Sequence, residues 1–428
     1  MTVRINKQKI NLREKLTEFE DKVNATQSLD ALVDTSRNID ITNLSTSGES
    51  IRNSGAVINN RFVPFGPHAR VLDLDPNNTN GLKGFKGGFT DGRYGYFVPN
   101  YHDGSYQGKV ARVDLNDFSS VDMLDLDPDG TLDPANTNGL KGFQGGFTDG
   151  RYGYFVPNLQ PSTHGNVARV DLSDFSSVSS LNLGLTDGDL VGFAGGFTDG
   201  RYGYLVPGTN SKIPRIDLND FTTVSYLDLD PNNVGGYNSF RGGFTDGVYG
   251  YFSSQSKFVR FNLKDFNDFE TLNFEDDSGN GGCFTDGRYA YTIPYRNSAN
   301  QAVYDMYRID LIDFKIIDVL KLNQANPGIN YNGNNNLLAG FLGGFTDGRY
   351  GYLVPHYSGG PSRSSVAARV DLNDFSTVDV LDFSNTDSGL RGFQGGFTDG
   401  RYGYFVPNYN GAYNGKIARI QLFNGGNF

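Results

Sequence analysis

Hydrophobic and polar residues alternate over short stretches along most of this chain, and one such stretch recurs throughout it. The stretch is clearest at residues 89–99, which read FTDGRYGYFVP. Its Phe-Thr-Asp-Gly core occurs seven times, starting at Phe89, Phe147, Phe197, Phe244, Phe284, Phe345 and Phe397. Successive copies start 40 to 61 residues apart. The chain is therefore built from repeats of one small unit.

Each copy of this stretch predicts a β-hairpin. An Asp-Gly pair between strand-forming residues is a strong hairpin signal, because a type I′ turn needs positive φ at both central residues, which Asp tolerates and Gly adopts freely. The preceding residues 84–89 (GFKGGF) are rich in glycine, as expected for strands that crowd around an axis. After the turn, Tyr94 and Tyr96 face one side and Phe97 the other. We expect this second strand to be buried on both faces.

Two further strands complete the unit. Residues 110–115 (VARVDL) predict a third strand and residues 121–126 (VDMLDL) a fourth. Repeats of roughly 40 to 50 residues with several short strands are typical of a β-propeller. The last repeat ends after its third strand, whereas residues 71–75 near the start form an unpaired strand pattern. We therefore predict an all-β, seven-bladed β-propeller of four-stranded antiparallel blades, with a composite last blade closed from the N-terminal side.

The amino-acid sequence of the four strands resembles the YVTN-type and related bacterial propeller repeats. In those repeats a Pro/Thr-Asp-Gly-Lys/Arg turn precedes a Tyr-rich strand and then a Val-x-Val-Asp strand. The resemblance covers residues 56–428, which we expect to form the propeller domain. It implies an architecture and no particular activity, because propellers host binding, scaffolding and several chemistries.

Residues 1–55 lie outside the repeats and predict a short helix followed by an extended arm. Asn11 can cap a helix whose apolar positions recur at spacings of four, three and four residues, namely Leu12, Leu16, Phe19 and Val23. Residues 24–55 are rich in Ser, Thr, Asn and Asp, without clear periodicity. We expect this segment to attach the propeller to other structural proteins, or to further copies of the chain within an assembly.

Composition and charge narrow the functions open to the chain. It has 33 Phe, 25 Tyr and 56 Gly but no Trp, which suits a turn-rich β fold with large side chains between sheets. A formal net charge of −11 without Lys/Arg runs argues against a nucleic-acid partner. The single cysteine, Cys283, excludes an internal disulfide. Without an apolar signal region or a membrane-length apolar run, we expect a soluble protein with no signal peptide and no membrane insertion.

Loop lengths predict the binding face. The first-to-second and third-to-fourth connections are short and nearly constant, whereas the second-to-third and fourth-to-first connections vary between repeats. In an up-and-down blade both variable classes lie on one face, and recognition usually resides on variable loops held by a rigid scaffold. Amphipathic side chains on these loops suit contact with proteins or sugar rings: Tyr101, His102, Tyr106, His164, Tyr295, His356, Tyr357, Tyr409 and Tyr413. The alternative for any one tyrosine is that it only covers loop backbone.

Signals for metal binding and catalysis are weak. Asp125, Asp127 and Asp129 match the opening of a calcium loop, but its twelfth position is Asn136 instead of the bidentate Glu. The histidines lie in different repeats without a shared-metal spacing: His68, His102, His164 and His356. A nucleophile elbow and a phosphate-binding loop are also missing from the sequence. We predict no metal, no cofactor and no enzyme activity, with a propeller hydrolase as the least favoured alternative.

The first residues carry a second resemblance. Residues 1–14 (MTVRINKQKINLRE) resemble the start of tailed-phage virion proteins, especially cyanophage-like tail or capsid-attached adhesins. The resemblance implies a virion location after synthesis in the host cytoplasm; otherwise the protein is expected in the cytoplasm. The leading hypothesis is a non-enzymatic virion structural and adhesion module that presents its variable loop face to a host-surface glycan or protein. The alternative is a free-standing carbohydrate-binding lectin.

Overall fold

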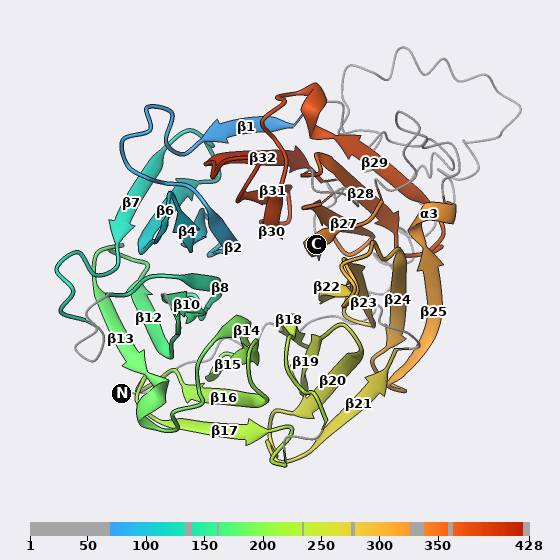
Figure 1. Cartoon of the computed structure of the whole chain (residues 1–428), viewed down its shortest axis with the longest axis horizontal. Helices are drawn as coiled ribbons and strands as arrows, with labels where there is room; N and C mark the ends of the chain where they lie inside the picture. The colour runs from blue at the N-terminus through green and yellow to red at the C-terminus, as the bar shows by residue number, and fades with distance from the viewer. Residues whose placement is uncertain are drawn as a thin grey trace, which may run out of the picture. The chain divides into compact units, whose positions relative to one another are not determined.

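Seven four-stranded antiparallel sheets stand as blades around a central axis (Figure 1). The computed structural model describes residues 69–132, 139–160, 162–232, 235–274, 279–325, 338–357 and 363–422. The predicted all-β, seven-bladed propeller is confirmed. The predicted assembly helix and the domain boundary between residues 55 and 56 lie outside the described residues and stay predictions.

Within blades 1 to 6 the strands follow one another in sequence from the axis outward. Blade 1 comprises β2 (Phe85–Thr90), β3 (Tyr94–Pro99), β6 (Lys109–Asp114) and β7 (Val121–Asp125). Blade 2 comprises β8 (Phe143–Thr148), β9 (Tyr152–Pro157), β12 (Asn166–Asp171) and β13 (Val178–Asn182). Blade 3 comprises β14 (Phe193–Thr198), β15 (Tyr202–Pro207), β16 (Lys212–Asp217) and β17 (Val224–Asp228).

The next three blades repeat this plan. Blade 4 comprises β18 (Arg241–Thr245), β19 (Tyr249–Ser253), β20 (Lys257–Asn262) and β21 (Phe269–Asn273). Blade 5 comprises β22 (Asn280–Thr285), β23 (Tyr289–Pro294), β24 (Asp305–Asp310) and β25 (Lys315–Lys321). Blade 6 comprises β26 (Phe341–Thr346), β27 (Tyr350–Pro355), β28 (Val366–Asp371) and β29 (Val378–Asp382).

Blade 7 joins the two ends of the propeller. It contains β30 (Phe393–Thr398), β31 (Tyr402–Pro407) and β32 (Lys416–Gln421), and its outer strand is β1 (Arg70–Asp73). In the antiparallel register of β1 and β32, Arg70 lies opposite Arg419 and Asp73 opposite Lys416. Figure 1 shows blue β1 alongside red β32. The predicted composite blade is confirmed, and it covers the edge that β32 would otherwise expose.

Short elements decorate the connections between these strands. They are β4 (Tyr101–His102), β5 (Ser105–Tyr106), β10 (Leu159–Gln160), β11 (Ser162–Thr163), the 3-10 turns η2 (Leu183–Leu185) and η3 (Phe383–Asn385), and α3 (Leu322–Ala325). No helix in the described ranges is long and apolar enough to cross a membrane.

The Asp-Gly turns differ from the predicted type I′ geometry. In the first turn only the glycine has positive φ, 94° at Gly92, whereas a type I′ turn needs positive φ at both central residues. Asp91 does not have positive φ. Its carboxylate stabilises the turn by hydrogen bonds. It accepts hydrogen bonds from the amides of Arg93 (2.9 Å) and Tyr94 (2.7 Å) and from the Tyr96 hydroxyl (2.8 Å). The type I′ prediction was therefore wrong, although the hairpins themselves are present.

The glycines of the inner strands are required by crowding at the axis. A Cβ on Gly87, whose φ is +84°, would lie 3.1 Å from the Cα of Gly145. A Cβ on Gly343 would lie 2.7 Å from the Cα of Gly395. Real Cβ atoms rarely approach this closely, so neighbouring inner strands meet only because these side chains are absent.

The cores lie between adjacent blades. Tyr96, Phe97 and Val98 of β3 are fully buried, which confirms that the second strand is covered on both faces. Phe89 of blade 1 stacks on Tyr96 at a centroid distance of 5.1 Å and meets Phe155 of blade 2 edge-on at 5.6 Å. Such aromatic pairs add about 0.5–1.5 kcal/mol to the burial of their area. Buried aromatic side chains thus join each blade to the next.

Candidate functional site: the loop rim and the central pocket

The second-to-third connections fold into small hairpins in five blades. In blade 1 Tyr101 of β4 lies opposite Tyr106 of β5, and blade 2 has the corresponding pair β10 and β11. Single bridges close the others, joining Arg296 to Ala302, Tyr357 to Arg363 and Tyr409 to Tyr413. In blades 3 and 4 the same connection is only residues 208–211 and 254–256. The rim formed by these connections therefore has paired loops in blades 1, 2, 5, 6 and 7 and only short connections in blades 3 and 4.

A glycine before the inner strand anchors several of these hairpins. The amide of Tyr357 donates to the carbonyl of Gly340 (2.9 Å), and that of Tyr409 donates to the carbonyl of Gly392 (3.1 Å). Gly392 has a φ of +67°, and a Cβ there would lie 1.8 Å from the Tyr409 carbonyl oxygen. Because the loop crosses directly over a glycine, the tyrosine backbone is fixed to the blade.

Aromatic and arginine side chains of these hairpins make a continuous row of contacts, which we call the rim belt. Its members are Tyr101, Tyr106, Tyr295, Arg296, His356, Tyr357, Arg363, Tyr409 and Tyr413. At one end the rings of Tyr106 and Tyr101 meet at 4.9 Å, and Tyr101 meets Tyr413 of blade 7 at 5.5 Å. Tyr413 then meets Tyr409 at 5.1 Å.

Arginines continue the rim belt into blades 6 and 5. The Arg363 guanidinium lies 4.9 Å from the ring centre of Tyr409 and 4.0 Å from that of Tyr357. On its other side Tyr357 receives Arg296, at 4.2 Å. The tyrosines and arginines are half-buried, so each presents part of its surface to solvent. Cation–π contacts of this kind contribute about 0.5–2 kcal/mol each.

Two of the predicted loop residues lie outside the rim belt. The His102 Nδ1 atom is 3.2 Å from the Asp103 carboxylate. His164 is buried and its ring meets Phe143 edge-on at 5.8 Å. Burial lowers the pKa of His164 to about 4. The other seven predicted residues are brought together in the belt.

His356 has a structural position within the rim belt. Its Nδ1 atom lies 2.8 Å from the carbonyl oxygen of Phe393 in blade 7, and its Nε2 lies 2.8 Å from Nη1 of Arg363. A carbonyl can only accept, so Nδ1 carries the proton and Nε2 accepts from the arginine. Burial, followed by the charge of Arg363, lowers the pKa of His356 to about 3. The imidazole is therefore neutral and bridges two blades.

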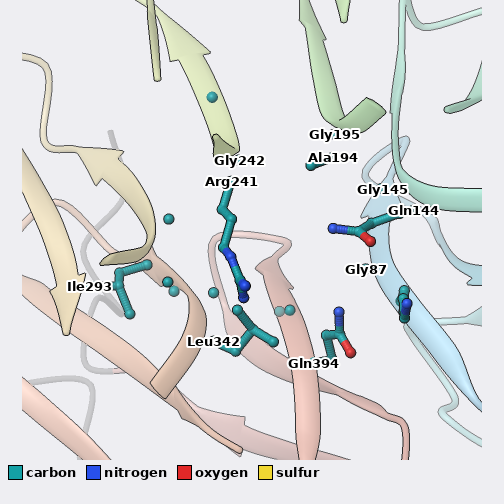
Figure 2. A pocket seen from close by; sticks show the side chains of 18 of the residues that line it. Gly87, Gln144, Gly145, Ala194, Gly195, Arg241, Gly242, Ile293, Leu342 and Gln394 are labelled. Carbon is teal, nitrogen blue, oxygen red and sulfur yellow. The ribbon is translucent and has the colours of Figure 1, made fainter. Parts of the chain in front are cut away.

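A pocket of about 240 Å³ lies on the axis, among the glycines of the inner strands. One position of each inner strand varies between blades, directly before the glycine pair or, in blade 5, before Gly282 and Cys283. Its occupants are Lys86, Gln144, Ala194, Arg241, Gly281, Leu342 and Gln394. Figure 2 shows Arg241, Gln144 and Gln394 pointing toward one space from three separate strands.

Sequence reasoning missed both this pocket and the two belt arginines. The inner strands repeat glycine and phenylalanine at fixed positions, yet the residue after the first phenylalanine differs in most copies. That variation was the available signal for the pocket. Arg296 and Arg363 carried no such signal, because nothing in a loop of irregular length shows which neighbouring ring an arginine will reach.

The Asp125 loop gives no support for a metal. Asp127 is buried, and its Oδ1 accepts a hydrogen bond from the Leu132 amide at 3.1 Å. Asp75 holds the amides of Thr79 (2.8 Å) and Gly81 (2.8 Å) in the same manner. Among the described residues no three His, Cys, Asp or Glu side chains are grouped so as to hold a metal ion.

The solved structures compared below are similar to this chain in fold. No protein-family model matches it, and no curated protein matches its sequence. A streptogramin B lyase structure superposes with a TM-score of 0.54 at 12% identity, covering 83% of this chain and 98% of that chain. The WD40 domain of Neurospora crassa Pan2 gives 0.54 at 10% identity, covering 84% and 95%. Kuenenia stuttgartiensis hydrazine synthase gives 0.51 at 14%, covering 80% and 96%.

These likenesses agree with the seven blades described above. The chain is a seven-bladed β-propeller, a class that hosts many unrelated functions. The resemblances to YVTN-type repeats and to phage virion proteins are not tested by these comparisons and stay predictions.

Proposed function

We propose that this protein is a non-enzymatic recognition module whose ligand face is the rim belt. The single observation that supports it is the unbroken row of half-buried tyrosines and arginines across blades 1, 7, 6 and 5. Tyrosine and arginine are the residue types enriched in binding hot spots, because they offer large contact areas with little loss of entropy. Their mutual contacts hold the side chains in place before any ligand arrives, which lowers the entropic cost of binding.

In its fuller form the proposal describes a virion adhesion protein. Residues 1–55 attach the propeller to a phage tail or capsid, and the rim belt meets a protein or glycan of the host surface. The resemblance of residues 1–14 to virion proteins supports this attachment. The low rim of blades 3 and 4 leaves the belt open from one side, which suits a large surface rather than an enclosed small molecule.

Binding to a panel of bacterial strains tests the role of the rim belt. Purified full-length protein is compared with a Tyr357→Ala/Arg363→Ala variant by flow cytometry. Loss of a hot-spot pair should weaken binding by about tenfold or more. Tyr226→Ala is the matched control, since Tyr226 is an exposed tyrosine of the outer strand β17. Equal binding by the belt variant and the wild type would exclude the rim belt as the ligand face.

The attachment role of residues 1–55 is tested separately. A chain lacking these residues should retain its cooperative unfolding but should no longer sediment with virus particles in an infected-cell lysate. Full-length protein in the same lysate is the reference. If the shortened chain sediments with particles as the full chain does, residues 1–55 are not the attachment segment.

A carbohydrate-binding lectin is the second candidate. The tyrosine rings of the rim belt offer flat faces on which sugar rings stack. A glycan array with full-length protein distinguishes the two functions. Specific binding to purified oligosaccharides, lost in the Tyr357→Ala/Arg363→Ala variant, would favour the lectin. Binding to cells without binding to any oligosaccharide would favour a protein receptor.

The proposal assigns no catalysis, and the lining of the axial pocket supports this choice. Within the described ranges that lining contains no Asp, Glu or His, the residue types that most often act as general acids and bases. A screen with generic ester, lactone and glycoside substrates tests it. Turnover that disappears in a Lys86→Met variant would identify an enzyme centred on the pocket.

A further inference from the structure

Two basic side chains enter the axial pocket from different blades. Lys86 comes from β2 of blade 1 and Arg241 from β18 of blade 4, and both line the same space. Figure 2 shows the Arg241 side chain reaching inward from β18. The amides of Gln144 and Gln394 line it as well. The pocket therefore combines two cations with two neutral hydrogen-bonding groups.

Neither cation has a neutralising partner in the part of the propeller that the structure describes. Among the described residues no carboxylate lies within ion-pair distance of Lys86 or Arg241, whereas many other basic residues of the propeller have one. Arg201 pairs with Asp217 at 3.3 Å, for example. Arg241 instead lies over the ring of Tyr295, at 4.8 Å from its centre. Two half-buried like charges that line one space repel each other, and an opposite charge in that space would relieve the repulsion.

The surrounding groups show the effect of this positive charge. Burial, with the charge of Arg241 second, lowers the pKa of Lys86 to about 8. The charges of Arg241 and Lys86 also help to keep His356 neutral, after the larger effects of burial and of Arg363. The positive region thus extends from the pocket to the base of the rim belt. It exists in a chain whose net charge is −11.

The walls of the pocket set the size of a ligand. Glycines surround it, and the inner strands are too close for larger residues at those positions. Its volume, about 240 Å³, is below the roughly 300–1,000 Å³ of pockets for drug-sized molecules. A small ion, or one end group of a larger ligand, fits this space.

We infer that the axial pocket binds one anionic group, a phosphate or a carboxylate, between Lys86 and Arg241. Gln144 and Gln394 supply amide N–H donors to the same group. Charge-assisted hydrogen bonds of this kind are the strongest that side chains offer to oxyanions. This site goes beyond the proposed rim function and does not require it.

The anionic group has two possible sources, a free ion and the acidic end of a larger ligand. Because Arg241 touches Tyr295 of the rim belt, a ligand on the belt can reach the pocket with an acidic group. Titration calorimetry at low ionic strength separates the sources. One arm uses inorganic phosphate and acetate, and the other compares methyl glucuronide with methyl glucoside, which differ by the carboxylate.

Full-length protein should bind at least one of these anions and should not bind the neutral glucoside at this site. Lys86→Met and Arg241→Met should each weaken anion binding by about tenfold. Lys264→Met and Arg201→Met are the matched controls, since both residues are exposed, and they should leave the dissociation constant unchanged. Unchanged affinity in the Lys86 and Arg241 variants, or no anion binding by the wild type, would overturn the inference.

A second measurement on the unmodified chain covers the case in which the variants do not fold. At pH 8 about half of Lys86 is neutral, given its lowered pKa of about 8, so it should be acetylated faster than the exposed Lys264. Inorganic phosphate should slow acetylation of Lys86 several-fold and leave Lys264 unaffected, as read by peptide mass spectrometry. Equal slowing of both lysines, or of neither, would contradict the site. The acetylation result does not test the rim belt, because the rim-belt variants are tested separately by their binding to bacterial cells.

Discussion

The side-chain amide of Asn408 in blade 7 donates a hydrogen bond of 2.9 Å to the carbonyl oxygen of Phe85 in blade 1, 323 residues away. Equivalent bonds run from Asn100 to Phe143 and from Asn158 to Phe193, each at 2.8 Å. The ring is therefore closed twice, by this buried bond near the axis and by β1 at the periphery.

Replacing Asn408 with alanine should destabilise the propeller by about 1–3 kcal/mol, because the buried Phe85 carbonyl is left without its donor. Urea unfolding gives the free energy of unfolding. Asn158→Ala should have a similar effect on the bond between blades 2 and 3. Asn219→Ala is the control, since Asn219 is exposed, and should stay within about 0.5 kcal/mol of the wild type. A loss no larger than the control's would show that this bond does not support closure.

Truncation should reveal the role of β1. A chain that begins at residue 69 keeps the fourth strand of blade 7 and should remain monomeric. A chain that begins at residue 76 exposes the edge of β32 and should melt at a lower temperature and associate. A synthetic peptide covering residues 69–75 should restore the melting temperature by adding a strand to that edge. Equal stability and monomeric behaviour of the two chains would mean that β1 is dispensable.

His356 should contribute to acid sensitivity. Its pKa in the folded protein, about 3, lies below the ordinary value of 6.5. The unfolded chain therefore binds a proton first as the pH falls. Stability should decline between about pH 6.5 and pH 3, with a slope of up to about 1.4 kcal/mol per pH unit from this group.

The variant His356→Asn should flatten this acid slope. Asparagine can keep the inter-blade bond, as Asn408 does in the next blade, but it does not titrate. Unfolding free energies measured from pH 7 to pH 3.5 test this. His356→Leu should lose stability at every pH, since the Phe393 carbonyl then lacks its donor. An acid slope in His356→Asn as steep as in the wild type would contradict the prediction.

The hydroxyl of Tyr154 should contribute more to the stability of the propeller than the hydroxyl of Tyr152. Tyr154 is fully buried and donates to the Asp149 carboxylate at 2.8 Å, and burial raises its pKa. Tyr154→Phe should cost about 1–3 kcal/mol, as for hydrogen bonds to charged groups. Tyr152→Phe should cost under about 0.5 kcal/mol, because the half-buried Tyr152 uses its ring, over which Arg169 lies at 4.6 Å. Thermal denaturation of both variants measures these losses of stability. Equal losses in the two variants would refute the role given to the Tyr154 hydroxyl.

The sequence by itself determined the repeat, the hairpins, the four strands of a blade and the strand that completes the last one. These features follow from local rules: alternation defines a strand, glycine marks crowding, and a repeat that ends one strand early must be completed elsewhere. These rules did not predict the turn type. Asp91 does not adopt positive φ, and its carboxylate accepts hydrogen bonds from the amides of Arg93 and Tyr94.

Only the tertiary structure decided which side chains meet. Lys86 and Arg241 are 155 positions apart in the sequence and line one pocket because the ring brings blades 1 and 4 to a common axis. The rim belt likewise depends on where irregular loops cross their anchoring glycines. His356 was predicted from its loop as a contact residue, and the fold places it at the position where blades 1, 2 and 7 have an asparagine that bonds to the next blade. The local sequence pattern specifies the strands of each blade. Closure of the ring decides which side chains of different blades come into contact.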